Sequence, residues 1–289
     1  MRPMAADENP RPRRSVLFVP ASNPRAMDKA RGLDCDVVIL DLEDAVGADM
    51  KTEARAAVTA AVREGFDGRE VVVRCNGLDT AWGAEDLAAL AAAGPDAVLV
   101  PKARTAADIS AYERALAGAP TTTRLWAMIE TAAGVLNLAA IAGTGTRLDA
   151  LVLGPNDLSA ELRLKPLPGR AALQPMLSRV VVAARAHGLA ALDGVFNAIG
   201  DDDGLAAECA QAAAFGFDGK TLIHPSQIAP ANQAFSPSVD EVEWARAVTA
   251  AFAAPDAQGK GAIRVQDRMV ERLHLEQARR VLALTAMSR

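Results

Sequence analysis

The chain has 289 residues, a length that fits either one α/β barrel or two average domains. Half of the residues are apolar but only 4% are aromatic, which indicates a core of small and branched side chains under alanine-rich helices. The formal net charge of -5 comes with no basic run, so we expect neither a nucleic acid nor a membrane surface as a partner.

The chain begins with a polar, proline-rich stretch, MRPMAADENPRPRR, and we expect residues 1–13 to be flexible. This stretch has no apolar leader segment, and no uncharged apolar run of 18 residues follows it. Three widely spaced cysteines, Cys35, Cys75 and Cys209, form no disulfide or zinc pattern and are expected to be structural in a reducing compartment. A cytoplasmic location is therefore expected.

Short apolar runs alternate with longer amphipathic segments, a pattern typical of strand-helix units around a parallel sheet. Each run is too short for a helix and apolar throughout, as expected of strands that are covered on both faces. The predicted strands begin at Ser15, Val37, Val71, Ala97, Leu125, Ala150, Leu189 and Lys220. The clearest predicted helices span residues 50–63, 85–93, 105–116, 173–187 and 203–215.

Eight such units predict an α/β fold, a closed (β/α)₈ TIM barrel with a C-terminal helical extension. A doubly wound sheet is the alternative, but the turn after the first strand, FVPASNPRAM, is not a glycine-rich nucleotide loop. We assign residues 1–235 to the barrel and residues 236–289 to the extension, with a last helix from about Met269 to Met287. We expect the extension to pack on the barrel or on a neighbouring subunit.

Charged or titratable residues follow nearly every predicted strand, at the barrel face where catalytic groups of this fold lie. A polar residue also commonly marks the end of a strand, and for Asp193 and His224 this simpler explanation has equal weight. A ring of carboxylates with one arginine and one lysine would leave buried charges unless a ligand bound among them, and a hard divalent cation fits. The strand-end residues are Asp41, Glu43, Asp44, Arg74, Asn76, Lys102, Glu130, Asp157, Asp193 and His224.

Glu130 and Asp157 follow adjacent strands and are the best ligand pair for Mg²⁺ or Mn²⁺, which take one or two protein carboxylates and keep sites for water and substrate. A helix cap or a salt bridge to Arg74 is the alternative role for Glu130. Arg74 offers two parallel donors to a carboxylate or to a developing enolate oxygen, and Lys102 can add positive charge. Pairing of both cations with the nearby acids is an alternative that can coexist with these roles.

The order of several motifs resembles that of the HpcH/HpaI aldolase and citrate lyase β-subunit superfamily, in the branch that acts on CoA esters. The similar blocks include RRSVLFVPASNPRAMDKA, DVVILDLEDAVG, VVVRCNG, AVLVPKA, MIETAAGVLN, LVLGPNDLSAELR and FGFDGKTLIHPSQI. The resemblance implies a TIM barrel, a divalent ion, coenzyme A as part of the substrate, and a homotrimer or a dimer of trimers.

The same resemblance implies roles for single residues. It implies that Glu130 and Asp157 bind the metal, that Arg74 contacts substrate, and that Glu43 and Asp44 support metal-bound waters and the arginine. Lys102 is placed with these catalytic groups because of its own position after the fourth predicted strand. The residues assigned to substrate or CoA binding are Arg74, Pro20, Arg25, Lys29 and Asn156.

One block departs from the family pattern. Lyases of this branch carry a G-x-M-I-D-x-P-H-like block whose aspartate reaches a neighbouring subunit's active site as an acid or base. Here VQDRMVERLHLEQ puts Glu271 at the aspartate position and Leu273 at the proline. Glutamate is one methylene longer, and a misplacement of ~1 Å can lower a rate ~100-fold.

The resemblance implies a Mg²⁺-dependent carbon-carbon lyase that splits a malyl-, citramalyl- or citryl-CoA-type ester into acetyl-CoA and a 2-oxo acid by a retro-Claisen reaction. The altered block around Glu271 leaves a (3S)-malyl-CoA-type thioesterase on the same barrel as one alternative. The other alternative is a citrate lyase β-type subunit that acts on an acyl carrier within a complex.

Overall fold

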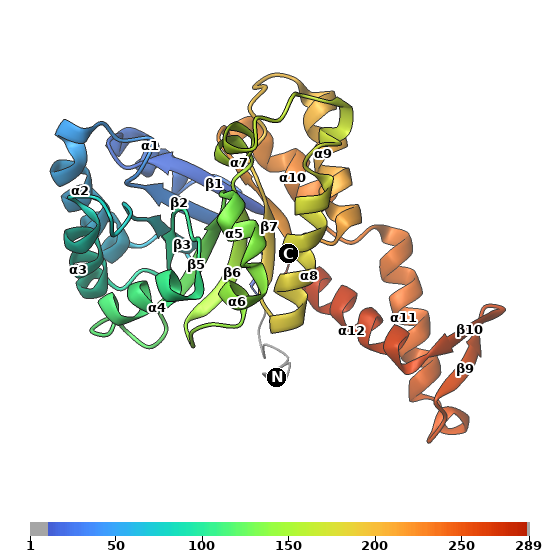
Figure 1. Ribbon diagram of the computed structural model, residues 1–289. Coiled ribbons are helices and arrows are strands. Elements are labelled where there is room, and N and C mark those ends of the chain that lie inside the picture. Colours follow the sequence, from blue (N-terminus) through green and yellow to red (C-terminus); the bar gives the residue numbers. More distant parts are fainter. Residues whose placement is uncertain (1–10, 288–289) are drawn as a thin grey trace. The chain divides into compact units, whose positions relative to one another are not determined.

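The computed structural model describes residues 11–287, which form two compact units (Figure 1). The larger unit is Arg13–Ala234, and the smaller one continues from Phe235. The predicted flexibility of the N-terminus falls mostly on residues 1–10, outside the described residues. The cysteines Cys35, Cys75 and Cys209 are all buried and none forms a disulfide.

Eight parallel strands close into a barrel in the larger unit, which confirms the predicted fold. Neighbours along the chain are neighbours in the sheet, and β1 pairs with β8 to close the ring. Every predicted strand is present within a few residues. The strands are β1 (Ser15–Pro20), β2 (Val37–Asp41), β3 (Glu70–Arg74), β4 (Ala97–Val100), β5 (Arg124–Ile129), β6 (Leu148–Leu153), β7 (Ala190–Asp193) and β8 (Gly219–Leu222).

Helices follow the strands and cover the outside of the barrel (Figure 1). The long ones match the predicted ranges within two residues: α2 (Lys51–Glu64), α3 (Gly83–Ala93), α4 (Ala106–Ala115), α8 (Gln174–His187) and α9 (Asp202–Phe215). Short helices are added by α1 (Pro24–Ala30), α5 (Ala132–Leu136), α6 (Leu138–Ala142), α7 (Pro155–Glu161) and α10 (Ile228–Ala234), with 3₁₀ turns η1 (Ala48–Met50), η2 (Pro168–Arg170) and η3 (Pro225–Gln227). These are too short for a helical period to stand out in the sequence.

The interior of the barrel is filled by alternate residues of each strand, because successive side chains of a strand point to opposite faces. Buried interior residues include Ile39 of β2, Val72 of β3, Met128 of β5 and Val152 of β6. One further step of two residues along each strand therefore brings Asp41, Arg74, Glu130 and Gly154 to the interior at the carboxyl ends. The alternation of side chains along each strand thus determines which of the strand-end residues face one another inside the barrel.

The amino ends of the strands are closed by a buried ion pair around Arg13. Its guanidinium donates to both oxygens of Glu70 at 2.8 and 2.7 Å, and to Asp149 at 2.6 Å. It also stacks over the Trp126 ring, 4.8 Å from the ring centre. Glu70 is 4% exposed, so it relies on Arg13 for its charge partner. Arg13, the end of the segment predicted to be flexible, is therefore fixed to the barrel.

Replacing Arg13 with alanine should lower the free energy of unfolding by about 3 kcal/mol, because it leaves the buried Glu70 carboxylate without its partner. Urea unfolding measures this change. The matched control is Arg264→Ala, which removes an exposed arginine from an exposed ion pair with Asp267 and should change stability by less than about 0.5 kcal/mol. Equal effects of the two substitutions would show that the ion pairs of Arg13 with Glu70 and Asp149 do not stabilise the barrel.

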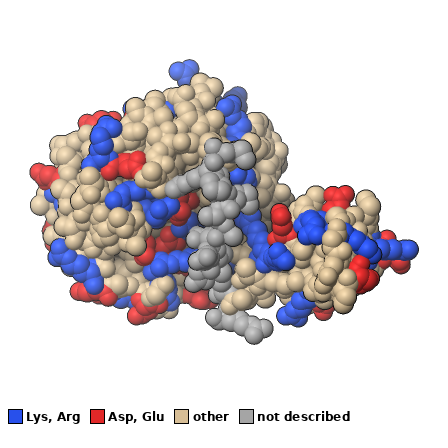
Figure 2. Space-filling view, turned by 90° about the horizontal axis from the view of Figure 1, so that it is seen from below, with Lys and Arg blue, Asp and Glu red and all other residues tan. Residues whose placement is uncertain are grey.

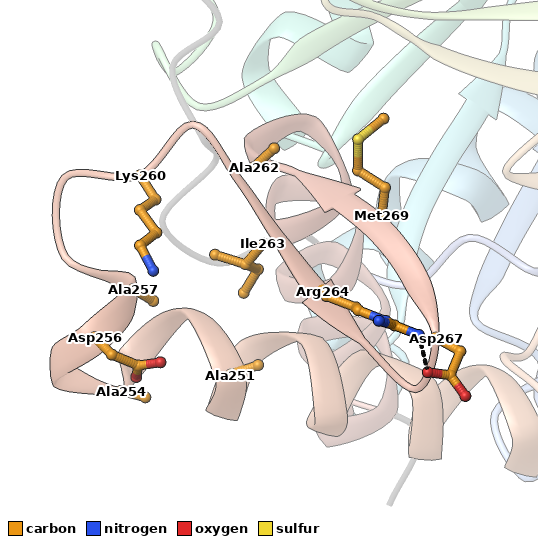
Figure 3. A pocket seen from close by; sticks show the side chains of 10 residues that line it. All are labelled: Ala251, Ala254, Asp256, Ala257, Lys260, Ala262, Ile263, Arg264, Asp267 and Met269. Atoms are coloured by element: carbon orange, nitrogen blue, oxygen red, sulfur yellow. Dashed lines mark hydrogen bonds and ion pairs between the residues drawn. The ribbon is translucent and has the colours of Figure 1, made fainter.

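The smaller unit contains a helix pair and a β-hairpin with its own apolar core. Its elements are α11 (Val239–Ala253), the 3₁₀ turn η4 (Pro255–Ala257), β9 (Ala262–Val265), β10 (Arg268–Glu271) and α12 (Arg272–Met287). Strands β9 and β10 are antiparallel, and Val265, Val270 and Leu275 belong to one buried cluster. An open hollow lies beside the hairpin, with Lys260 and Arg264 among its lining residues (Figure 3).

The predicted start of the last helix at Met269 was wrong. Residues 268–271 form a strand, and the helix begins at Arg272. The hairpin turns at Gln266 and Asp267, whose φ angles of 46° and 63° suit a two-residue hairpin turn. Neither residue is the glycine that usually marks such a turn, so no turn signal is visible in the sequence at this point.

None of the helices within residues 11–287 combines the length and the hydropathy that a membrane span requires. On the face shown in Figure 2, acidic and basic side chains are interspersed with uncharged ones.

Candidate active site

Arg74 and Asp41 form a bidentate ion pair at the carboxyl end of the barrel. They are register partners on the neighbouring strands β3 and β2, and both are buried. Nε of Arg74 lies 2.7 Å from Oδ1 of Asp41, and Nη2 lies 2.6 Å from Oδ2. The sequence pointed to Asp41 only as one of several strand-end acids, whereas the register identifies it as the main partner of Arg74.

The guanidinium of Arg74 stays protonated. Burial opposes its charge, but the hydrogen bonds and charges of Asp41, with those of Glu43 and Asp44, outweigh burial and raise its pKa. Its plane lies over the Phe18 ring, with 5.0 Å between the guanidinium carbon and the ring centre. Arg74 is therefore a fixed, permanently charged donor inside the mouth of the barrel.

Glu43 connects Arg74 to Lys102. Oε2 of Glu43 lies 3.1 Å from Nη1 of Arg74, and Oε1 accepts a 2.6 Å hydrogen bond from Nζ of Lys102. Asp44 is more exposed and lies 3.4 Å from Nη1. Burial raises the pKa of Glu43, and the positive charges of Arg74 and Lys102 oppose that rise. The expected pairing of both cations with the acidic cluster is thus present.

Lys51 was missed by the sequence reasoning although it holds the loop that carries Glu43. Its Nζ is buried and donates to the carbonyl oxygens of Leu42 and Glu43, at 2.7 Å each. The Oδ2 and Oδ1 atoms of Asp41 accept the backbone N–H groups of Ala45 and Glu43. No spacing rule links a helix-start lysine to these carbonyls, so only the folded chain identifies it.

Glu130 follows β5 and is 1% exposed. Its Oε1 accepts the backbone N–H of Lys102 at 2.7 Å, while Oε2 has no hydrogen-bond partner among the described residues. Gly154 makes room for this carboxylate, because a Cβ at Gly154 would lie 2.5 Å from Oε2 of Glu130. A buried carboxylate oxygen without a partner is costly, and it is the feature that a bound cation would relieve.

The two alternative roles of Glu130 are filled by other residues. The side chain of Thr131 caps α5, and Arg74 forms its bidentate pair with Asp41. Burial raises the pKa of Glu130 to about 7, opposed by the Lys102 N–H and the Arg74 charge and assisted by Glu43 and Asp157. Asp157 is thus within electrostatic reach of Glu130.

The donor set fits a hard divalent cation. Asp157 is exposed in the first turn of α7, which begins directly after Gly154. Among residues 11–287 there is no cluster of three or more His, Cys, Asp or Glu side chains suited to a metal. Two carboxylates with other positions left to water and substrate are typical of Mg²⁺ or Mn²⁺ rather than zinc.

Asn76 lies outside this group, because its backbone N–H and its Nδ2 both donate to Oδ2 of Asp86. Two further strand-end residues also lie outside it. Asp193 follows the interior residue Leu192 and so points away from the barrel interior. On the outer side of the strand it pairs with Lys220 and Arg170. These charges lower its pKa despite complete burial. His224 is exposed and caps η3 through Ser226. For both residues the simpler structural explanation is correct.

The remaining predicted residues lie outside this hydrogen-bonded group. Pro20 ends β1, and Arg25 and Lys29 are exposed on α1. Asn156 exchanges amide hydrogen bonds with Asn197. Glu271 ends β10 in the smaller unit, and its N–H donates to Nδ1 of His274. The substrate, CoA and catalytic roles of these residues stay predictions.

In metal-free buffer the Glu130→Gln variant should lose less stability than the wild type between pH 5 and pH 8. The folded protein holds the Glu130 proton up to about pH 7, against an ordinary pKa of 4.5. Stability therefore falls as the pH rises through this window, by up to about 3 kcal/mol, and glutamine has no proton to lose. Urea unfolding in EDTA at several pH values measures this.

The matched control is Glu113→Gln, at a carboxylate whose pKa is lowered by hydrogen bonds from Thr146 and Arg147, against the raising effect of burial. This variant should keep the wild-type loss of stability between pH 5 and pH 8. If Glu130→Gln keeps it as well, Glu130 is not the buried acid that titrates near pH 7.

The chain is similar in sequence to several known proteins. Residues 14–225 match the HpcH/HpaI aldolase/citrate lyase family. Over 273 residues the chain is 47% identical to a (3S)-malyl-CoA thioesterase of Cereibacter sphaeroides, covering 94% of each chain. An L-malyl-CoA/beta-methylmalyl-CoA lyase of Cereibacter sphaeroides is 36% identical over an alignment of 297 positions, which covers 93% of each chain.

A solved structure is also similar over nearly the whole chain. It is the CitE protein of Mycobacterium tuberculosis in complex with magnesium, acetoacetate and coenzyme A, with a TM-score of 0.78 and 35% identity. The match covers 94% of this chain and 97% of that one.

Proposed function

Because the chain belongs to the HpcH/HpaI aldolase/citrate lyase family, we propose that it hydrolyses a CoA thioester of the (3S)-malyl-CoA type with the help of Mg²⁺ or Mn²⁺. The observation that carries this proposal is the 47% identity to a (3S)-malyl-CoA thioesterase along 94% of both chains, against 36% to a malyl-CoA lyase. The alternative weighed from the sequence is thus better supported than the lyase.

The reaction adds water to the thioester carbonyl, breaks the carbon-sulfur bond and releases malate and free CoA. In this proposal Glu130 and Asp157 hold the cation, which supplies Lewis acidity to substrate oxygens. Arg74, kept in place by Asp41, donates to the substrate carboxylate or to the negative oxygen that forms on water addition. We assign Glu43 as the group that takes the proton of the attacking water, with Lys102 balancing its charge.

Lyase activity is the second candidate. A similar lyase at 36% identity favours it, and Arg74 could equally stabilise an acetyl-CoA enolate. A glutamate stands at position 271 where the lyase block has an aspartate, which weakens this reading.

The wider assembly is part of the proposal. The complex of CitE with magnesium and coenzyme A supports a CoA site here, which we assign to Pro20, Arg25, Lys29 and Asn156. We further propose a homotrimer, or a dimer of trimers, in which the C-terminal extension carries Glu271 to a neighbouring active site.

The test supplies (3S)-malyl-CoA, citramalyl-CoA and citryl-CoA to the purified protein, with Mg²⁺ or with EDTA, and follows free thiol and 2-oxo acid together. We expect Mg²⁺-dependent thiol from malyl-CoA without glyoxylate. An oxo acid without thiol would replace the proposal with the lyase, and neither product from any ester would exclude both.

Substituting Arg74 with lysine should lower kcat/KM for the ester about 100- to 1,000-fold, because lysine keeps the charge but cannot form the bidentate pair with Asp41 and also donate to the developing oxyanion. The control is Arg55→Lys, at an arginine that pairs with Glu85 and Asp86 outside the site and should leave kcat/KM within about threefold. Steady-state kinetics on both variants decides; similar losses would mean that Arg74 acts only through stability.

A further inference from the structure

The first turn of α7 needs an external support if Asp157 is to meet a metal at Glu130. Asp157 is exposed, and no hydrogen bond or ion pair from residues 11–287 fixes its side chain. Its position therefore depends on the backbone of residues 154–157. What holds that backbone decides how accurately the two carboxylates converge.

The loop after β7, residues 194–200, contacts this turn at two points, and we call it the β7 loop. Gly194 lies against the Pro155 ring, so closely that a Cβ at Gly194 would be 2.1 Å from Cδ of Pro155. The side-chain amides of Asn197 and Asn156 pair, with Nδ2 of Asn197 2.7 Å from Oδ1 of Asn156 and Nδ2 of Asn156 3.4 Å from Oδ1 of Asn197. Both contacts involve the two residues just before Asp157.

The β7 loop is itself anchored to β8 and to the turn that follows β8. Nζ of Lys220 donates to the Gly194 carbonyl oxygen, and Nε2 of Gln227 donates to the Phe196 carbonyl oxygen at 2.9 Å. Lys220 and Gln227 are both buried. A buried ammonium that donates to a loop carbonyl holds the loop firmly, because movement of the loop would leave the buried charge without one of its hydrogen-bond partners.

Lys220 belongs to a charge network outside the barrel wall. Its Nζ also contacts Asp193 at 2.8 Å and Glu208 of α9 at 2.6 Å, and Arg170 contacts Asp193 at 2.9 Å. The two cations and two anions cancel, so the network has no net charge to offer a ligand. The proposed reaction does not use it, and the contact with Gly194 is its link to the site.

From these contacts we infer that Gly194 and Asn197, anchored by Lys220 and Gln227, are positioning residues that set the place of Asp157 relative to Glu130. The inference rests on the metal site of the proposed function. Residues that orient metal ligands typically change metal affinity 10- to 100-fold when altered. The β7 loop should therefore affect metal binding without touching the metal.

The test measures Mn²⁺ binding by electron paramagnetic resonance, with thermal unfolding of each metal-free variant. Gly194→Ala forces the Pro155 ring to move and should raise the Mn²⁺ dissociation constant about tenfold or more. Asn197→Ala removes the amide pair at an exposed position and should raise it about threefold. In both variants KM for the ester should change by a smaller factor than the Mn²⁺ dissociation constant.

Two matched controls separate positioning from general loosening. Gly83→Ala creates an equally close contact, 2.2 Å from the Gly77 carbonyl oxygen, at the start of α3. Asn232→Ala removes a hydrogen bond to the Asp34 carbonyl oxygen. Both should leave the Mn²⁺ dissociation constant unchanged even where they lower the unfolding temperature.

Glu130→Ala distinguishes failure of the inference from failure of the metal site. If Glu130→Ala abolishes Mn²⁺ binding while Asn197→Ala and Gly194→Ala bind as the wild type does, the inference is wrong and the metal site stands. If Glu130→Ala binds Mn²⁺ normally, the metal site itself is wrong. Equal weakening by the controls and the β7-loop variants would also overturn the positioning role.

Discussion

The buried carboxylate of Glu130 is the constraint on which the rest of the site depends. One of its oxygens is held by the Lys102 N–H, and the other faces Gly154 with no partner among the described residues. A fully compensated barrel would not need such an atom, because an aliphatic residue there would fold more favourably. The free-energy cost of this oxygen is explained if a bound cation becomes its partner. A second carboxylate, Asp157, lies three residues after Gly154, the glycine that makes room for the first.

Two charge networks lie at the carboxyl end of the barrel, one inside it and one outside its wall, because successive side chains of a strand point to opposite faces. The interior network, from Asp41 through Arg74 to Glu43 and Lys102, holds two cations and two anions at the mouth of the barrel. The network around Lys220 begins one residue along β7 from the interior residue Leu192, so it lies between the barrel wall and α9, and its charges cancel. The first lies at the proposed active site, where Arg74 can donate to a substrate oxygen, and the second is suited to holding a loop.

The sequence predicted the barrel and the positions of Glu130 and Arg74 at its carboxyl end, because continuous apolar runs mark buried strands and the residue after each run lies at the catalytic face. It did not separate interior from exterior residues, since that requires the end of each strand to within one position, and so Asp193 stood beside Glu130. Lys51 was missed because its partners are backbone carbonyls. The choice between hydrolysis and carbon-carbon cleavage was also beyond the sequence motifs, because both reactions can use the same arginine and carboxylates.

The most direct test of the central claim is the anomalous diffraction signal of crystals of the full chain soaked with Mn²⁺. The account predicts one strong peak bound by Oε2 of Glu130 and by the Asp157 carboxylate, at about 2.1 to 2.2 Å from each. The Glu130→Ala protein should show no peak at that place. A peak at other residues, or a Glu130 side chain that keeps its unpartnered oxygen at saturating Mn²⁺, would contradict the account.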